Sequence, residues 1–238
     1  MKLSKRLETV ASMVTKGNRA ADVGCDHGFV PIFLVESGIS PLAVAADVRP
    51  GPLSRAKEHI KEHRLEEKIQ TRLSDGLANI KPGEADSLIM SGIGGILMMR
   101  LLQDEEHTAK SFKELILSPQ SELFDVRRYL VSNGYLIEYE HMLCDEGKYY
   151  FIFHVLVKKD EREWLEEEYR YGKDICKDDM KTFLAYLEKE ERQYEQILEK
   201  MKQAPENDRA AQRIAQLHQD ITCLKKRRQL VYDCGCFA

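Results

Sequence analysis

The residues best suited to chemistry stand in the segment DVGCDHG, residues 22–28. This segment follows a short apolar run and leads into an apolar helix, so we expect it at the carboxyl end of a parallel strand, where doubly wound sheets bind ligands. Asp26 stands where a dinucleotide-binding turn has its second glycine, and its carboxylate would repel a pyrophosphate. The turn therefore argues against NAD and FAD. It suits a ligand with a positive centre, such as the sulfonium and ammonium groups of S-adenosylmethionine, although a tight turn with a capping aspartate is the alternative.

Two further acidic residues stand at the ends of the next two expected strands. Asp47 follows Gly24 by 23 residues, and a carboxylate in that place can accept hydrogen bonds from both hydroxyls of a ribose. Asp75 can bind an adenine amino group, while the adjacent Gly76 lets the base approach the backbone. Each of these alone can be an ordinary turn or helix cap. Three acidic turns at three successive strand ends together describe an adenosyl pocket.

Two other turns are candidates for the side of the pocket that receives a second substrate. Residues 91–95 (SGIGG) follow the fourth expected strand, and their glycines would let the backbone come close to a flat ligand such as a base. Residues 118–120 (SPQ) follow the fifth strand and supply the Gln120 amide, which can hydrogen-bond a base edge. The alternatives are a glycine turn required by packing and a plain surface turn.

Alternating strands and helices must position these turns. Strands are expected at 19–24, 42–48, 68–73, 86–92 and 114–119, and helices at 3–16, 29–38, 51–65, 94–103 and 122–134. Apolar strands that alternate with helices predict a parallel sheet covered on both faces. Segments 135–144 and 149–158 flank a turn with no helix between them, which predicts an antiparallel hairpin at the sheet edge.

Beyond residue 159 the pattern changes to long helical periodicity. Apolar residues with alternating three- and four-residue spacing are Met180, Phe183, Leu187, Tyr194, Ile197 and Met201, and then Ala210, Ile214, Leu217, Ile221, Leu224 and Val231. Two such helices joined by the segment QAPEND predict an antiparallel coiled-coil hairpin. We therefore expect two domains, a ligand-binding domain at 1–159 and a helical domain at 160–238.

Charge and cysteine usage narrow the classes of function. The formal net charge is -4, so a nucleic-acid partner would have to meet a local basic patch. No apolar run approaches the roughly 20 residues that cross a bilayer, and we expect a cytoplasmic protein without a membrane partner. The six cysteines show no C-x-x-C spacing. We therefore expect reduced thiols and no metal site, the pair Cys234 and Cys236 included.

The sequence resembles the bacterial tRNA (adenine(22)-N(1))-methyltransferases, a class I group. The segments that carry the resemblance are LSKRL (3–7), DVGCDHGFVP (22–31), SDGL (74–77), GEAD (83–86), GIGG (92–95) and LILSPQ (115–120), and it extends over the helical hairpin to nearly the whole chain. The resemblance implies a Rossmann-like α/β fold with a seven-stranded, mostly parallel sheet and an antiparallel last strand. It also implies S-adenosylmethionine as methyl donor and tRNA as partner, with methylation of N1 of an adenine in the D-arm.

The resemblance and the turns together predict the site residues. The expected cofactor-binding set is Arg6, Asp22, Gly24, Cys25, Asp26, His27, Asp47, Val48, Asp75, Gly76, Ser91 and Gly92. Our hypothesis for catalysis is in-line attack by adenine N1, with the enzyme supplying alignment and desolvation. Asp26 or His27 would accept the proton that N6 loses, and Gln120 would orient the amino group. Residues 91–94 do not form the Asn-Pro-Pro-aromatic run of many exocyclic-amine methyltransferases, which favours a ring nitrogen as the acceptor.

Contacts with tRNA phosphates require cations. The candidates are Lys2, Lys5 and Arg6, then Arg127 and Arg128, then Arg170 and Lys173, and finally Lys225, Lys226, Arg227 and Arg228. For each of them a solvated helix face is the alternative.

Other functions stay open at this point. They are a methyltransferase for a small molecule or a protein, and a catalytically silent adapter that binds the cofactor. A nicotinamide-dependent oxidoreductase is the weakest alternative, because Asp26 occupies the phosphate turn. The heptad hairpin leaves the oligomeric state open, and we favour a monomer.

Overall fold

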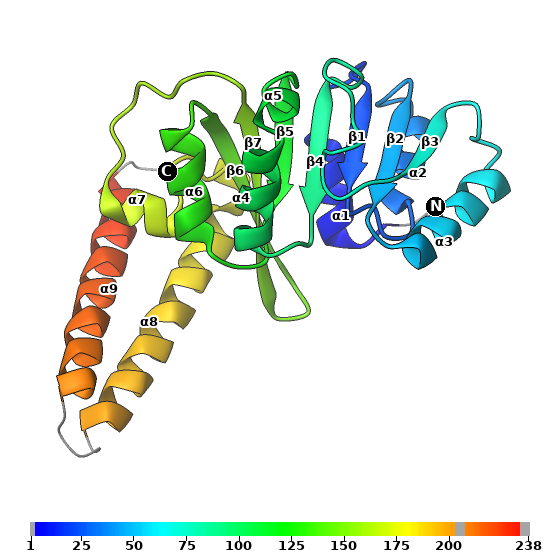
Figure 1. Ribbon diagram of the computed structural model, residues 1–238. Helices are drawn as coiled ribbons and strands as arrows, with labels where there is room; N and C mark the ends of the chain where they lie inside the picture. Colours follow the sequence, from blue (N-terminus) through cyan, green and yellow to red (C-terminus); the bar gives the residue numbers. More distant parts are fainter. Residues whose placement is uncertain (1–2, 203–207, 234–238) are drawn as a thin grey trace.

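A twisted sheet with helices on both faces forms the centre of the protein (Figure 1). The computed structural model describes residues 3–202 and 208–233. Five parallel strands are β1 (Ala20–Val23), β2 (Ala43–Asp47), β3 (Ile69–Leu73), β4 (Ser87–Ser91) and β5 (Glu114–Ser118). The antiparallel hairpin of β6 (Leu136–Asp145) and β7 (Lys148–Leu156) completes a seven-stranded sheet in the order β3-β2-β1-β4-β5-β7-β6. The predicted fold class is confirmed.

Apolar residues dominate the buried strands β1, β2, β4 and β5 because both faces of the sheet are covered there, whereas the edge strand β3 is largely polar. Along β1, Ala20 packs into the cluster on one face and Ala21 into the cluster on the other, as strand alternation requires. The first face is covered by α1 (Lys5–Ser12), α2 (Phe29–Glu36) and α3 (Pro50–Glu62), and the second by α4 (Gly95–Asp104), α5 (Glu106–Ala109) and α6 (Leu123–Ser132). Apart from the short α5, each of these helices was predicted, although α1 differs from the prediction in length.

The first helix is shorter than the predicted 3–16. Ser4 caps it as expected, because its hydroxyl accepts a hydrogen bond from the backbone N–H of Leu7. The helix ends at Ser12, and the chain then turns through Gly17, whose φ is 94°. Met13 and Val14 follow the end of the helix and are still buried in the core. Their burial therefore does not depend on a helical backbone.

The order of strands reverses between β1 and β4. The chain runs outward from β1 to β2 and β3 on one side, and from β4 to β5 on the other. In open α/β sheets the connections at such a point leave to opposite faces and create a crevice outside the carboxyl ends of the strands. All the acidic and glycine-containing turns predicted from the sequence lie at this end of the sheet.

The last third of the chain is a helical arm. After α7 (Glu166–Tyr171) and a 3₁₀ turn at Lys177–Asp179, α8 (Met180–Lys202) and α9 (Asp208–Asp233) run antiparallel and project from the sheet (Figure 1). The joining residues 203–207, within the predicted QAPEND loop, lie outside the described residues. Near the sheet, Phe183 and Leu224 belong to the same hydrophobic core as β5 and β7. The predicted boundary at 159/160 therefore stays a prediction.

One position of the predicted seam in the arm is wrong. Ile197 is 39% exposed, whereas Leu198 is 7% exposed and packs with Leu217 and Ile221. Along α8, which is continuous from Met180 to Lys202, the step from Tyr194 to the next buried residue is four and not three. In the described parts of the chain we find no helix with the length and hydropathy to cross a membrane.

Candidate functional site

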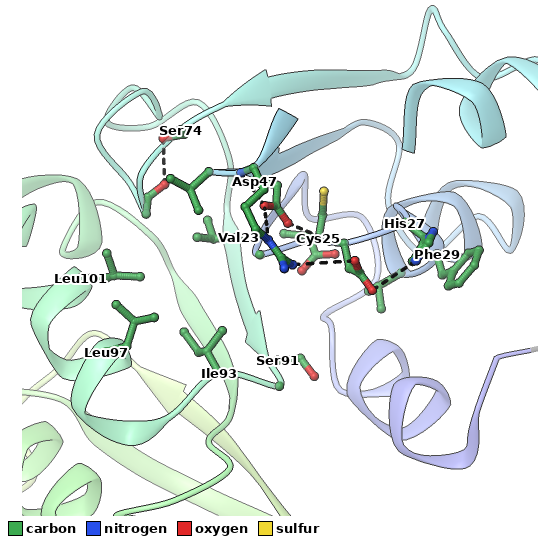
Figure 2. A pocket seen from close by; sticks show the side chains of 18 of the residues that line it. Val23, Cys25, His27, Phe29, Asp47, Ser74, Ser91, Ile93, Leu97 and Leu101 are labelled. Carbon is green, nitrogen blue, oxygen red and sulfur yellow. Dashed lines mark hydrogen bonds and ion pairs between the residues drawn. The ribbon is translucent and has the colours of Figure 1, made fainter. Parts of the chain in front are cut away.

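A cavity of about 470 Å³ lies at the carboxyl ends of β1 to β4, at the point where the strand order reverses (Figure 2). Its lining contains every residue of the predicted cofactor-binding set, together with Gln120. Their convergence follows from the topology, because parallel neighbouring strands end at the same edge of a sheet. The roles of the individual residues stay predictions, but the structure places all of them at one site.

The turn after β1 depends on unusual backbone geometry. Gly24 and Gly28 have φ values of 79° and 73°, and Asp26 has a φ of 48°, in the left-handed region. A Cβ at Gly28 would lie 3.1 Å from the Cβ of Ala56 on α3. A glycine is therefore needed at position 28 both for the turn and for the close approach of α2 to α3.

Asp47 ties the turns after β1 and β2 together. Its Oδ2 accepts a hydrogen bond from the backbone N–H of Asp26 at 3.2 Å, and its Oδ1 accepts one from the N–H of Arg49 at 2.8 Å. A carboxylate offers about four lone-pair positions, so this buried side chain can still accept hydrogen bonds from a ligand. The guanidinium of Arg49 approaches both carboxylates, with Nε 3.7 Å from Asp47 Oδ1 and Nη2 4.0 Å from Asp26 Oδ1.

Two buried carboxylates, those of Asp22 and Asp47, favour a cation at the floor of the cavity. Asp22 is 4% exposed, and this burial raises the pKa of its carboxyl to about 7, with the negative charge of Asp47 adding to the effect and Arg6 opposing it. Burial likewise raises the pKa of the Cys25 thiol, assisted by the charges of Asp22 and Asp47. Cys25 is thus an uncharged part of the wall, and a positively charged ligand would relieve the repulsion between the carboxylates.

The turn after the third strand places polar backbone against an apolar side chain of α4. Ser74 Oγ donates to the carbonyl of Gly76 at 2.9 Å and accepts from the N–H of Asn79 at 3.0 Å. These bonds hold the turn in which Gly76 has a φ of 56°. A Cβ on Gly76 would lie 2.5 Å from Cδ2 of Leu101. The backbone of this turn is therefore in close contact with α4.

The turns after β4 and β5 meet next to the first helix. Nη1 of Arg6 donates to Ser91 Oγ, and the backbone N–H of Gln120 donates to the carbonyl of Ile93 at 2.9 Å. A Cβ on Gly92 would lie 3.5 Å from both Arg6 Nη1 and Gln120 Nε2. The glycine therefore leaves room for two side chains rich in hydrogen-bond donors to converge at the cavity.

His27 lines the cavity beside Asp26, with its Nε2 3.5 Å from Asp26 Oδ2. Its ring stacks on Phe29 at a centroid distance of 5.3 Å, and its backbone carbonyl lies 3.0 Å from Nδ1 of His59. These contacts fix the ring at the start of α2. The two predicted proton acceptors are thus neighbours, with 59% of the Asp26 side chain and 27% of the His27 side chain exposed.

Sequence reasoning missed several lining residues. They are Leu7, Val23, Phe29, Val30, Arg49, Ser74, Ile93, Leu97 and Leu101. Arg49 could have been found, since a cation two residues after the acidic end of a strand is a natural partner for it. Leu97 and Leu101 carry no such signal, because an apolar residue on a helix predicts core packing first.

Two of the predicted tRNA-contacting cations are wrong. The side chain of Arg127 is fully buried and pairs with Glu140, so it cannot contact a phosphate. Arg227 is 6% exposed and donates to the backbone carbonyls of Gly172 and Lys173. Arg127 joins the sheet domain to α7, Arg227 joins α9 to the segment after α7, and neither is available to a large partner.

Some of the other candidate cations form ion pairs with carboxylates, and others are exposed. Arg170 contacts Glu166 and Asp220, and Lys173 contacts Glu168. Lys225 and Arg228 share the carboxylate of Glu191. The residues Lys5, Arg128 and Lys226 are exposed. Lys2 lies outside the described residues.

Known proteins with the same architecture are also similar to this chain in sequence. A family model described as a methyltransferase domain matches residues 3–153. The tRNA (adenine(22)-N(1))-methyltransferase of Bacillus subtilis (strain 168) is 29% identical over 232 residues, which cover 95% of this chain and 97% of that protein. The crystal structure of the B. subtilis m1A22 tRNA methyltransferase TrmK matches with a TM-score of 0.84 and 28% identity, over 94% of this chain and 98% of that chain.

A second crystal structure adds a ligand to the comparison. A Streptococcus pneumoniae protein in complex with S-adenosyl-L-methionine matches with a TM-score of 0.82 and 31% identity, over 94% of this chain and 99% of that chain. The family model covers the sheet alone, whereas the likeness to the B. subtilis enzyme and to the two crystal structures spans both the sheet and the arm. This chain therefore belongs to the methyltransferase-domain family and, within it, to the bacterial tRNA (adenine(22)-N(1))-methyltransferases.

Proposed function

We propose that this protein transfers a methyl group from S-adenosylmethionine to N1 of adenine 22 in the D-arm of tRNA. The observation that carries the proposal is the cavity whose floor is formed by Asp22, Asp47 and Asp75 at three neighbouring strand ends. The carboxylates of Asp22 and Asp47 are buried, whereas that of Asp75 is exposed. Three carboxylates in such a place suit a cationic adenosyl ligand and disfavour a pyrophosphate. The family membership of the chain supplies the reaction and the acceptor.

The residues present fit the methyl donor, which supplies an electrophilic methyl group when it is bound. Asp47 is held by two backbone N–H groups and can accept from the ribose hydroxyls. Asp75 and Gly76 line the same cavity as the apolar side chains of Leu97 and Leu101, which suits the adenine base. Asp22 and Asp26 provide the negative charge that balances the ammonium and sulfonium groups.

On the acceptor side, this chain's residues align the base and take up a proton. Once N1 of adenine carries a methyl group, N6 must lose a proton to restore the neutral base. Asp26 and His27 both lie at the cavity and both can accept it, while the Gln120 amide next to Gly92 can orient N6. Arg6 holds Ser91 and so fixes the turn after β4.

We place the tRNA on the face that leads from Gln120 to the arm. Arg128 is exposed, and its guanidinium lies 5.5 Å from the ring centroid of Phe124 on the same helix. Tyr169 meets Phe124 edge to face and stacks on Trp164 at 5.0 Å. Aromatic rings beside cations suit unpaired bases and their phosphates. Lys5 and Lys226 are further exposed cations that can contact the backbone of the tRNA.

We also propose that the protein acts as a monomer in the cytoplasm. The support for a monomer is that one chain alone supplies the acidic floor, the apolar wall and the acceptor-side turns of the cavity. The support for the compartment is the proposed substrate, since tRNA is modified where translation takes place.

The test is to map the methylated nucleotide. The purified chain is incubated with an unmodified tRNA transcript and methyl-labelled donor, and the product is digested and analysed by mass spectrometry. We expect one N1-methyladenine at position 22, and no label in a transcript with guanine at that position. Label that enters a protein or metabolite fraction instead would favour the alternative substrates. Donor binding without turnover would favour the silent adapter.

A further inference from the structure

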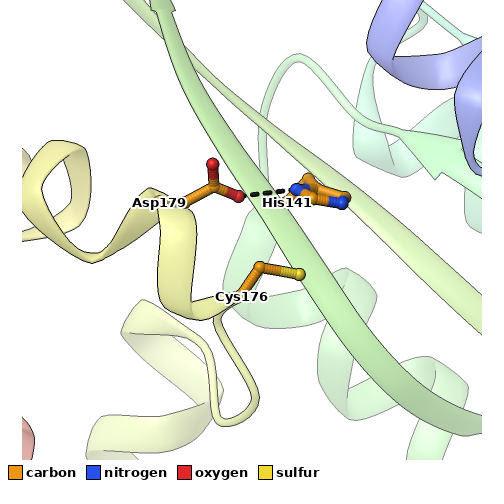
Figure 3. Close-up of side chains that lie close together, drawn as sticks. All are labelled: His141, Cys176 and Asp179. Atoms are coloured by element: carbon orange, nitrogen blue, oxygen red, sulfur yellow. Dashed lines mark hydrogen bonds and ion pairs between the residues drawn. The ribbon is translucent and has the colours of Figure 1, made fainter. Parts of the chain in front are cut away.

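Three side chains of metal-ligand type converge outside the cavity, at the edge of the sheet where the arm begins. His141 lies on β6, Cys176 directly precedes the 3₁₀ turn, and Asp179 ends it (Figure 3). The ligand atoms of the three side chains all lie within 4.8 Å of one another. None of them takes part in the proposed methyl transfer.

The backbone holds these side chains in place. Residues 174–176 run beside β6, where the N–H of Glu140 donates to the carbonyl of Asp174 at 2.8 Å and the N–H of Cys176 donates to the carbonyl of Glu140 at 2.9 Å. Asp179 is anchored as well, because its N–H donates to the carbonyl of Cys176 at 3.0 Å. The cluster is therefore built on an edge strand and a hydrogen-bonded turn.

The geometry is close to what a tetrahedral metal ion requires. His141 Nδ1 lies 2.7 Å from Asp179 Oδ2, whereas nitrogen and oxygen ligands of one Zn²⁺ ion lie roughly 3.3 Å apart. Small rotations of the two side chains would open this gap, and Cys176 Sγ lies within 4.8 Å of both ligand atoms. Figure 3 shows the Asp179 carboxylate facing the His141 ring, with the Cys176 side chain next to this pair. All three are half-buried, so water can reach the site.

We propose that His141, Cys176 and Asp179 form a binding site for a single Zn²⁺ ion, with water as the fourth ligand. Imidazole, thiolate and carboxylate are the three side-chain groups that Zn²⁺ takes as ligands. This mixed set with a sulfur disfavours Mg²⁺ and Ca²⁺, which prefer oxygen ligands. The inference goes beyond methyl transfer and does not depend on it.

A proton competes with the metal for the same groups. Hydrogen bonds with Asp179 and then with Cys176 raise the pKa of His141 to about 10 in the metal-free protein. Zn²⁺ takes up the lone pair of the imidazole, so its binding must release this proton. The alternative is that the cluster is only an ion pair between β6 and the turn before α8.

At this location the ion would link the arm to the sheet domain. Asp179 directly precedes Met180, the first residue of α8, and His141 belongs to the sheet. A metal ion that bridges them would fix the root of the arm to the sheet domain, in addition to the hydrophobic contacts of Met180 and Phe183. It would therefore restrict the directions in which the arm can point.

The test uses the full chain after removal of metals with a chelator. Co²⁺ is titrated as a spectroscopic substitute, and Zn²⁺ is then used to displace it. We expect a thiolate-to-cobalt charge-transfer band in the native chain, in the Cys144→Ser control and in the double variant Cys234→Ser and Cys236→Ser. The band should be lost in Cys176→Ser. Absence of the band in the native chain, its survival in Cys176→Ser or its loss in the tail variant would overturn the proposal.

A second measurement does not depend on absorbance. Zn²⁺ should raise the thermal unfolding midpoint of the native chain and of Cys144→Ser, and should leave that of Cys176→Ser and His141→Ala unchanged. Binding of S-adenosylhomocysteine serves as the check that each variant is folded. An equal effect of Zn²⁺ on native chain and variants would show that the cluster is an ion pair alone.

Discussion

Arg127 and Glu140 form an ion pair with both side chains fully buried and with Nη2 2.7 Å from Oε2. Nη1 of Arg127 also donates to the carbonyls of Tyr169 and Arg170, and the guanidinium lies 5.0 Å from the ring centroid of Phe153. The pair therefore connects α6, β6 and α7. This buried ion pair therefore joins the arm to the sheet domain at a place that solvent does not reach.

Breaking this pair should cost much stability. Arg127→Met leaves the Glu140 carboxylate buried without its partner, and we expect a loss of about 3–5 kcal/mol in the free energy of unfolding. The double variant Arg127→Met and Glu140→Leu should lose less, because no charge is then left alone. Urea unfolding measures both. Arg128→Met, on the exposed neighbour, is the control and should stay within about 0.5 kcal/mol of the native chain; a similar value for Arg127→Met would contradict the structural role.

Donor affinity should depend on pH through Asp22. The pKa of this carboxyl in the ligand-free protein is about 7, and a cationic ligand binds better to the charged form. Affinity should therefore fall below neutral pH, by about tenfold per pH unit at the steepest, and level off above it. Calorimetry with S-adenosylmethionine at a series of pH values measures this.

The control for this pH profile is Asp75→Asn. This variant should bind S-adenosylmethionine more weakly than the native chain, but its affinity should depend on pH in the same way. Asp22→Asn should flatten the profile. It should also stabilise the ligand-free protein at neutral pH, because a carboxyl whose pKa is raised on folding makes the protein less stable as the pH rises from about 4 to about 7. A pH dependence that survives in Asp22→Asn would assign it to another group.

Gly76→Ala should weaken donor binding by about tenfold or more. Gly76 and Gly83 both have positive φ, so an alanine at either position has a similar backbone strain of about 1–2 kcal/mol. Only at Gly76 would the new Cβ meet Leu101, at 2.5 Å, while at Gly83 nothing lies within 4 Å. Gly83→Ala is therefore the matched control. Equal affinities of the two variants would mean that the turn at Gly76 does not touch the donor.

Asp26→Asn should separate charge from backbone shape. Asparagine tolerates the left-handed conformation of this position, so the turn should be retained while the carboxylate is lost. If Asp26 accepts the N6 proton, turnover at saturating donor should fall by about a hundredfold or more, a larger change than in donor affinity. His27→Gln is measured in parallel, and unchanged turnover in Asp26→Asn would leave His27 as the acceptor.

Salt dependence should reveal which cations contact the tRNA. Each of Arg128→Gln and Lys226→Gln should reduce the slope of log affinity against log salt by about one, as expected for the loss of one phosphate contact. Lys61→Gln on the exposed face of α3 is the control, because α3 lies at the opposite end of the sheet from the arm (Figure 1). A slope unchanged in Arg128→Gln would exclude the surface around Phe124.

The sheet and the cavity could be predicted from the sequence because their signals are local. Apolar strands such as β1 end in turns whose glycines and aspartates have a direct chemical meaning, as at Gly24 and Asp47. Parallel topology then brings the turns together without further information. The antiparallel hairpin of β6 and β7 was visible for the same reason, since two strands without a helix between them must pair directly.

What could not be predicted depends on partners far away in the sequence. Arg127 and Arg128 are neighbours on one helix, but only the structure shows that Glu140 faces the first of them. Leu101 contacts Gly76 because α4 packs beside the turn after β3. The spacing of apolar residues along α4 does not predict this contact. The shift from Ile197 to Leu198 has a similar origin, because the residues that cover Leu198 are Leu217 and Ile221 on the other helix of the arm.

The arm consists of two segments that are held by different contacts. Its base shares the core of the sheet domain, whereas its far half is stabilised by the small cluster around Leu198 and Leu217. The far half can therefore unfold locally at a low free energy while the base stays folded. Substitutions in this outer cluster should leave the donor cavity intact, because none of the residues of the cluster lines that cavity.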